Sequence, residues 1–160
     1  MTEKLQSFEP ATGNLLWEGE YNDIGAEIER AASAWMHWAA QPVSFRVETM
    51  RRFANVVRAQ EEALADLIAR ETGKPLWEAR TEVGSVINKV DISIAAYSER
   101  TGQRRLEGAM GARQNLRHKP HGVMAVLGPY NFPAHLPNGH IVPALIAGNA
   151  VVFKPSEKTP

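Results

Sequence analysis

Cysteine is absent from the sequence, and this absence excludes more chemistry than any other feature of the composition. The 160 residues have no disulfide, no thiolate ligand for a metal ion and no thiol nucleophile of their own. An excess of one charge is also missing, because 18 Lys and Arg balance 18 Asp and Glu. Without a basic excess to neutralise phosphates, the composition argues against a nucleic-acid partner.

Long apolar runs are missing as well. No segment approaches the roughly 20 apolar residues of a membrane span, so no membrane partner is expected. The first residues, Met1–Leu5, lack the basic and apolar regions of a secretory signal. We therefore expect a cytoplasmic protein. A hydrophobic fraction of 44% is too high for a disordered chain.

Three amphipathic segments fill most of the first hundred residues. Apolar residues recur there at steps of three and four, as on one face of a helix. The pattern predicts helices over residues 24–41, 44–73 and 76–102, bounded by polar caps, proline and glycine. Before them, Pro10–Gly13 indicates a turn between two short strands.

Residues 103–120 lose the helical pattern and contain four arginines. The composition fits a loop with extended, exposed strands, and charge alone favours a solvated surface. The alternative is a protruding arm that pairs with another subunit.

The last forty residues contain a strand–helix–strand unit. Val123–Leu127 and Ala150–Phe153 are short apolar runs typical of buried parallel strands, and a helix is expected between them from Ala134 to Ala147. Such a connection is right-handed and its strands are parallel. Two parallel strands are too few for a complete sheet, so we expect the chain to be the beginning of a longer α/β protein.

The loops after these strands hold the best candidates for chemistry. Ligands of open α/β sheets bind beyond the carboxyl ends of the strands, so Gly128–Pro133 and Lys154–Glu157 are expected side by side at one edge. Asn131 offers an uncharged amide donor for an oxygen that becomes negative during a reaction. Lys154 supplies a cation, and Glu157 can accept hydrogen bonds from two ribose hydroxyls. A polyol-phosphate ligand would use both residues.

Simpler interpretations of the same residues remain open at this point. An asparagine in a proline-flanked turn is often only a turn residue, and a lysine after a strand is usually solvated. No standard glycine-rich phosphate loop occurs. The histidine pairs 118/121 and 135/140 lack the i, i+4 spacing of a helical metal pair, so we expect no metal site.

Several motifs in a fixed order carry a resemblance to a known family. They are Glu71-Thr-Gly-Lys-Pro75, Gly128-Pro-Tyr-Asn-Phe-Pro133, Pro143-Ala-Leu-Ile-Ala-Gly-Asn149 and Phe153-Lys-Pro-Ser-Glu-Lys-Thr-Pro160. Together they resemble the aldehyde dehydrogenase superfamily over nearly the whole chain. Three further stretches, 87–89, 116–122 and 130–143, are similar to one branch of it, the N-succinylglutamate 5-semialdehyde dehydrogenases of bacterial arginine breakdown.

The resemblance implies the N-terminal part of an aldehyde dehydrogenase fold, with helices plus the first strand–helix–strand unit of a Rossmann-like parallel sheet. Residues 1–102 would hold the first strands and helices of the cofactor-binding domain. Residues 121–160 would be an incomplete Rossmann-like cofactor-binding unit. Residues 103–120 would be an oligomerisation arm, which reverses the preference for a solvated surface and implies a homo-oligomeric full-length protein.

Roles for individual residues follow from the same resemblance. Asn131 corresponds to the catalytic asparagine whose amide stabilises the thiohemiacetal oxyanion. The cofactor NAD would be contacted beneath its nicotinamide half and at its adenosine ribose by Leu127, Gly128, Pro129, Tyr130, Lys154, Ser156 and Glu157. The helix after Asn131 lines the substrate tunnel, so three residues are candidates for contact with a small-molecule aldehyde: Phe132, His135 and Leu136.

The implied reaction is oxidation of an anionic semialdehyde to the acid. His135, and with less support Lys89, would complement the anion, and Glu157 would repel the 2′-phosphate of NADP and so favour NAD. The family's mechanism also needs a cysteine thiolate and a glutamate base, and no cysteine is present. We therefore expect the 160 residues alone to be inactive. The alternatives are a truncated folding or oligomerisation module and a related semialdehyde or acyl-phosphate reductase.

Overall fold

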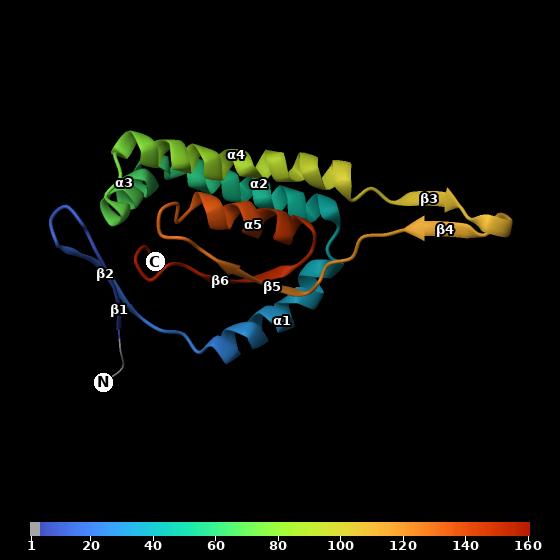
Figure 1. The fold of residues 1–160 in the computed structure, drawn as a ribbon, viewed down its shortest axis with the longest axis horizontal. Coiled ribbons are helices and arrows are strands. Elements are labelled where there is room, and N and C mark those ends of the chain that lie inside the picture. The colour runs from blue at the N-terminus through green and yellow to red at the C-terminus, as the bar shows by residue number, and fades with distance from the viewer. Residues whose placement is uncertain (1–3) are drawn as a thin grey trace.

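The computed structural model describes residues 4–160, in which helices pack against a small parallel sheet (Figure 1). The elements, in chain order, are β1 (Lys4–Phe8), β2 (Leu15–Glu20), α1 (Ile24–Ala40), α2 (Val43–Ala59), α3 (Glu61–Thr72), α4 (Leu76–Arg100), β3 (Arg104–Glu107), the 3-10 turn η1 (Ala109–Gly111), β4 (Arg113–Leu116), β5 (Val123–Leu127), α5 (His135–Ile146) and β6 (Ala150–Lys154). The strands form three two-stranded sheets, β1–β2, β3–β4 and β5–β6. The expected α/β class is confirmed.

The predicted turn at Pro10–Gly13 joins the antiparallel strands β1 and β2. This hairpin is fixed to the end of α3 by two side-chain contacts. Ser7 Oγ donates to Glu71 Oε1 at 2.6 Å, and Arg70 Nε donates to Glu9 Oε1 at 3.1 Å. The hairpin therefore supports the turn between α3 and α4, which carries part of the candidate site.

The prediction of one helix over residues 44–73 is wrong. The chain forms two helices, α2 and α3, which meet at Gln60 with φ −117° and ψ 19°. Neither proline nor glycine lies at this break, so no local signal marks it. Both helices contact α4, and the break lets Ala54 and Ile68 each reach the same buried core.

Helix α4 is the centre of that core. Its apolar stripe is buried at Val83, Val86, Ile87 and Val90, and of these Val83, Ile87 and Val90 pack in one cluster with residues of α2, α3 and α5. Helix α1 begins as predicted, because Asp23 Oδ1 accepts the backbone N–H of Ala26 at 3.1 Å. Of the helices within residues 4–160, none combines the length and apolarity that crossing a membrane requires.

Strands β5 and β6 pair in parallel, from Val123 opposite Ala150 to Leu127 opposite Lys154. Helices α1 and α5 contact both strands and lie on opposite sides of the sheet (Figure 1). The expectation that these strands are fully buried is only half met, because Leu127 is 74% exposed and Phe153 is 40% exposed. Cover is therefore weakest at the carboxyl ends of the strands, the edge where ligands of such sheets bind.

Two buried polar side chains join this unit together. Asn149 Oδ1 accepts the backbone N–H of His121 at 2.6 Å and of Gly122 at 3.1 Å, which fixes the start of β5 beside the start of β6. Arg46 of α2 donates through Nε to the carbonyl of Ile146 at 2.9 Å, at the end of α5. These bonds satisfy backbone groups that burial would otherwise leave unpaired.

Residues 103–120 form a hairpin that extends away from the rest of the molecule (Figure 1). Strands β3 and β4 are antiparallel and exposed along their length, as the prediction of extended, exposed strands requires. Met110 lies at the tip with φ 59°, a left-handed conformation, and its side chain is fully exposed. The hairpin therefore presents its surface to solvent in this chain.

Candidate functional site

The loop from β5 to α5 lies at the carboxyl edge of the parallel sheet, next to the segment that follows β6. Gly128 N donates to the carbonyl of Lys154 at 2.9 Å, and Thr159 Oγ1 donates to the carbonyl of Tyr130 at 3.1 Å. The two loops expected side by side, 128–133 and 154–157, are therefore neighbours. Gly128 is tightly enclosed here, because a Cβ atom on it would lie 2.9 Å from the ring of Phe153.

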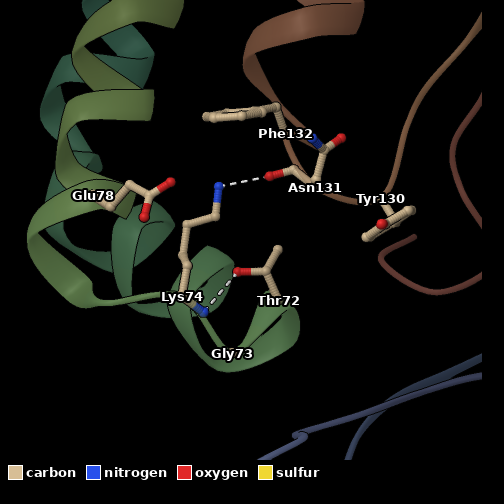
Figure 2. A pocket seen from close by; sticks show the side chains of 7 residues that line it. All are labelled: Thr72, Gly73, Lys74, Glu78, Tyr130, Asn131 and Phe132. Atoms are coloured by element: carbon tan, nitrogen blue, oxygen red, sulfur yellow. Dashed lines mark hydrogen bonds between the residues drawn. The ribbon is translucent and has the colours of Figure 1, made fainter.

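Asn131 is exposed on this loop, and its main chain is held while its side chain is not. Its carbonyl oxygen accepts a hydrogen bond from Lys74 Nζ at 2.7 Å. Figure 2 shows the carboxamide on the other side of the main chain from that ammonium. Within residues 4–160, no hydrogen bond to the carboxamide is formed. The amide N–H groups are thus available to a ligand.

Lys74 comes from the turn between α3 and α4. Gly73 ends α3 in a left-handed conformation, φ 75°, which a residue without Cβ adopts at no steric cost. The ammonium of Lys74 lies 2.7 Å from Glu82 Oε2 and 4.1 Å from the centre of the Phe132 ring. The exposed fractions of the Lys74 and Glu82 side chains are 9% and 0%, so this ion pair is buried.

The second carboxylate oxygen of Glu82 binds the main chain where the β5–α5 loop passes into α5. Glu82 Oε1 accepts the backbone N–H groups of Ala134 and His135, each at 3.0 Å. These N–H groups lie at the start of α5, where a helix has donors without intrahelical partners. A negative charge at a helix N-terminus is also favourable. Glu82 therefore caps α5 from a neighbouring helix.

A pocket of about 330 Å³ opens between this turn and this loop (Figure 2). Its lining residues are Thr72, Gly73, Lys74, Glu78, Tyr130, Asn131 and Phe132. The pocket thus brings three predicted site residues together with the α3–α4 turn. The other predicted residues do not line it: Leu127, Gly128, Pro129, His135, Leu136, Lys154, Ser156 and Glu157.

Lys154 and Glu157 lie at the same edge of the sheet, outside the pocket. Lys154 Nζ lies 3.0 Å from Glu157 Oε2, and both side chains are exposed. The backbone N–H of Glu157, and then the Lys154 ammonium, hold the pKa of the Glu157 carboxyl below its usual value. Ser156 is buried, and its hydroxyl accepts the backbone N–H of Lys158 at 3.2 Å, so this hydroxyl stabilises the turn.

His135 and Leu136 lie in the first turn of α5. The His135 ring meets the Phe132 ring edge to face, with centres 6.4 Å apart. Its Nδ1 atom is buried and has no hydrogen-bond partner within the described residues. Leu136 is exposed. Between residues 4 and 160 there is also no cluster of three or more side chains suited to hold a metal ion.

The sequence interpretation missed the contributions of Lys74, Glu82 and Thr159 to this loop. A signal for Glu82 did exist, because it lies three residues after Ala79 and four before Val86, on the buried stripe of α4. A carboxylate in that register must find donors when the helix packs. No comparable local signal exists for Lys74, which lies 57 residues from Asn131 in sequence.

The chain is similar to known proteins over its whole length. The chain matches the aldehyde dehydrogenase family over residues 1–160. It is 74% identical, over all its 160 residues, to N-succinylglutamate 5-semialdehyde dehydrogenase of Sphingopyxis alaskensis, and it spans 33% of the length of that relative.

Solved structures of the family share the fold. An NADP-dependent glyceraldehyde-3-phosphate dehydrogenase from Bacillus halodurans, complexed with NADP, aligns at a TM-score of 0.91 with 27% identity, covering 98% of this chain and 35% of that one. An NAD-dependent benzaldehyde dehydrogenase from Corynebacterium glutamicum aligns at 0.90 with 28% identity, covering 99% and 35%. From the family match and these similarities, the chain belongs to the aldehyde dehydrogenase family.

Proposed function

We propose that residues 1–160 supply the oxyanion-stabilising loop and part of the nucleotide site of an enzyme that oxidises N-succinylglutamate 5-semialdehyde to the acid with NAD. The observation that carries this proposal is the free amide of Asn131 on a loop whose main chain is fixed from two sides. The high identity to the Sphingopyxis alaskensis relative supports the substrate. Because the chain spans about a third of that relative, the activity belongs to the whole enzyme.

Asn131 acts on the carbonyl oxygen of the aldehyde. When a nucleophile adds to the carbonyl carbon, this oxygen gains negative charge, and an amide N–H already in place stabilises it without reorganisation. The nucleophile, a cysteine thiolate, comes from outside these residues, which contain no cysteine. NAD, when bound, accepts the hydride that leaves the substrate carbon.

The residues at the sheet edge fit a nicotinamide dinucleotide. Glu157 is exposed and, like any carboxyl whose pKa is at or below its usual value, ionised at neutral pH, so its two oxygens can accept hydrogen bonds from ribose hydroxyls. Lys154 and residues 127–130 complete the nucleotide contacts that we propose, while Ser156 holds the turn beneath them. The carboxylate of Glu157 favours NAD, since it would repel a 2′-phosphate.

A chimera tests the function. Residues 1–160 replace the matching segment of the Sphingopyxis alaskensis relative, and NADH formation is followed by absorbance. The chimera should oxidise N-succinylglutamate 5-semialdehyde with NAD, whereas the 160 residues alone should form no NADH because they have no nucleophile. An inactive but folded chimera would contradict the proposal and favour a non-catalytic folding or oligomerisation module.

Glu157→Gln in this chimera should raise the preference for NADP relative to NAD by about tenfold, which corresponds to roughly 1.4 kcal/mol. The change removes the charge that faces the 2′ position and keeps the shape of the side chain. The ratio of kcat/KM for the two cofactors measures it. Glu62→Gln, at an exposed glutamate on α3, is the matched control. An unchanged ratio would exclude Glu157 from the ribose site.

His135 and Lys89 are proposed to face the carboxylates of the substrate. The unpartnered Nδ1 of His135 supports this, and so does the end of the Lys89 side chain, which lies against Gly139 of α5, four residues after His135. His135→Leu should raise KM for the anionic semialdehyde about tenfold and for a neutral aldehyde less than about twofold. Equal changes for both aldehydes would rule out recognition of charge by His135.

The β3–β4 hairpin is proposed as the oligomerisation arm, because it extends from the molecule and exposes Leu106, Met110 and Leu116. We also propose that residues 1–102 and 121–160 belong to the cofactor-binding domain and that residues 103–120 form the arm.

A further inference from the structure

The buried ion pair of Lys74 and Glu82, here called the Lys74–Glu82 bridge, also binds the main chain at Asn131 and at the start of α5. We propose that the bridge is a positioning device that holds the Asn131 amide where the oxyanion forms. The inference rests on the proposed function, because it assigns a role for Lys74 and Glu82 within the same site.

The bridge holds the main chain at Asn131 and again at the start of α5. Lys74 Nζ binds the carbonyl of Asn131 itself at 2.7 Å and faces the Phe132 ring. Glu82 Oε1 binds the N–H groups of Ala134 and His135 at 3.0 Å. The main chain is thus held at the residue that carries the amide and again three residues later, where α5 begins.

The contacts on the opposite side of the loop are of a different kind. There, Gly128 N donates to the carbonyl of Lys154 at the end of β6, and the carbonyl of Tyr130 accepts from Thr159 in the segment after it. These bonds attach the loop to the sheet. The bridge attaches it to α4 and to the α3–α4 turn, so the position of Asn131 relative to the helical layer depends on two charged side chains.

The stability of the fold does not by itself explain why a charged pair is buried at this position. A buried ion pair is often no more stable than apolar residues of the same volume, because both charges lose their hydration. A carboxylate and an ammonium do, however, form short directional bonds to the main chain, which apolar side chains cannot form. Such bonds fit a loop whose displacement by about 1 Å would slow the reaction about 10²-fold.

A double-mutant cycle in the chimera tests this role. Glu82→Gln should lower kcat about 10–100-fold and change KM for NAD less than about twofold, since the loop shifts while the nucleotide edge stays. In an Asn131→Ala background, the same Glu82→Gln change should lower kcat less than about threefold, because no amide remains to be misplaced. Glu62→Gln, which breaks the exposed Arg80–Glu62 pair between α3 and α4, should change neither constant.

A merely structural role gives a different result. If Glu82→Gln lowers kcat by the same factor with and without the Asn131 amide, the bridge does not act through that amide and the proposal is overturned. If Glu82→Gln fails to fold, Lys74→Met combined with Glu82→Gln leaves no lone buried charge and takes its place in the cycle.

Amide hydrogen exchange of residues 128–136 separates this inference from the proposed function. Glu82→Gln should speed exchange in this segment about tenfold or more, whereas Glu62→Gln should not. Should the parent chimera be inactive, the proposed function fails, and unchanged exchange would then also overturn the positioning role. Should Asn131→Ala lower kcat while exchange and the cycle show no effect of Glu82→Gln, only the positioning role fails.

Discussion

Replacing Asn131 with alanine should lower kcat for aldehyde oxidation about 10²–10³-fold in the full-length chimera, the cost of removing one donor from an oxyanion site. The side chain is exposed and its amide makes no hydrogen bond within residues 4–160, so its loss should leave the fold unchanged. The carbonyl that Lys74 binds is retained in alanine. The effect should therefore fall on the reaction, with KM for NAD nearly unchanged.

Single-turnover kinetics measures the loss in the rate of aldehyde oxidation. Thermal unfolding of the same sample shows whether the fold is unchanged. Asn55→Ala is the matched control, because it removes an exposed asparagine side chain from α2 that, within residues 4–160, bonds only to Arg58 on the same helix. It should change kcat less than about twofold. A loss below about threefold in the Asn131 variant would exclude this amide from the oxyanion site.

Lys74→Met should lower the free energy of unfolding by about 3–5 kcal/mol, because it leaves the Glu82 carboxylate buried without its cation. The change also removes the donor to the Asn131 carbonyl and the cation above the Phe132 ring. Urea unfolding of the 160-residue chain, followed by circular dichroism at one fixed protein concentration, measures the difference between variants.

Arg80→Met provides the comparison for this stability effect. Arg80 pairs with Glu62 at 2.8 Å, but both side chains are exposed, so the loss should be below about 1 kcal/mol. Adding Glu82→Gln to Lys74→Met should recover part of the stability, since the lone charge is gone. Equal losses for Lys74→Met and Arg80→Met would mean that the buried pair contributes no more than a surface pair.

Three features were predictable from the sequence, because each depends on local information. They are the β1–β2 hairpin, the parallel pair β5–β6 and the common sheet edge of the loops 128–133 and 154–157. Apolar periodicity marks the helices, Pro10–Gly13 marks the first turn, and two apolar runs separated by a helix imply parallel strands. Parallel strands place their carboxyl ends together, so Asn131 and Lys154 belong at one edge whatever the rest of the chain does.

Only the tertiary structure determined the helix break at Gln60 and the pairing of Lys74 with Glu82. Neither proline nor glycine marks Gln60, and the break exists because α2 and α3 each pack on α4. By sequence, Lys74 is an ordinary charged residue in the turn before α4, and the register of Glu82 on the apolar stripe of α4 indicates burial without identifying its partners. Burial of this pair requires α5 to dock on α4, which brings together residues 52 to 57 positions apart. Contacts over such separations depend on packing and chain closure, which no local pattern encodes.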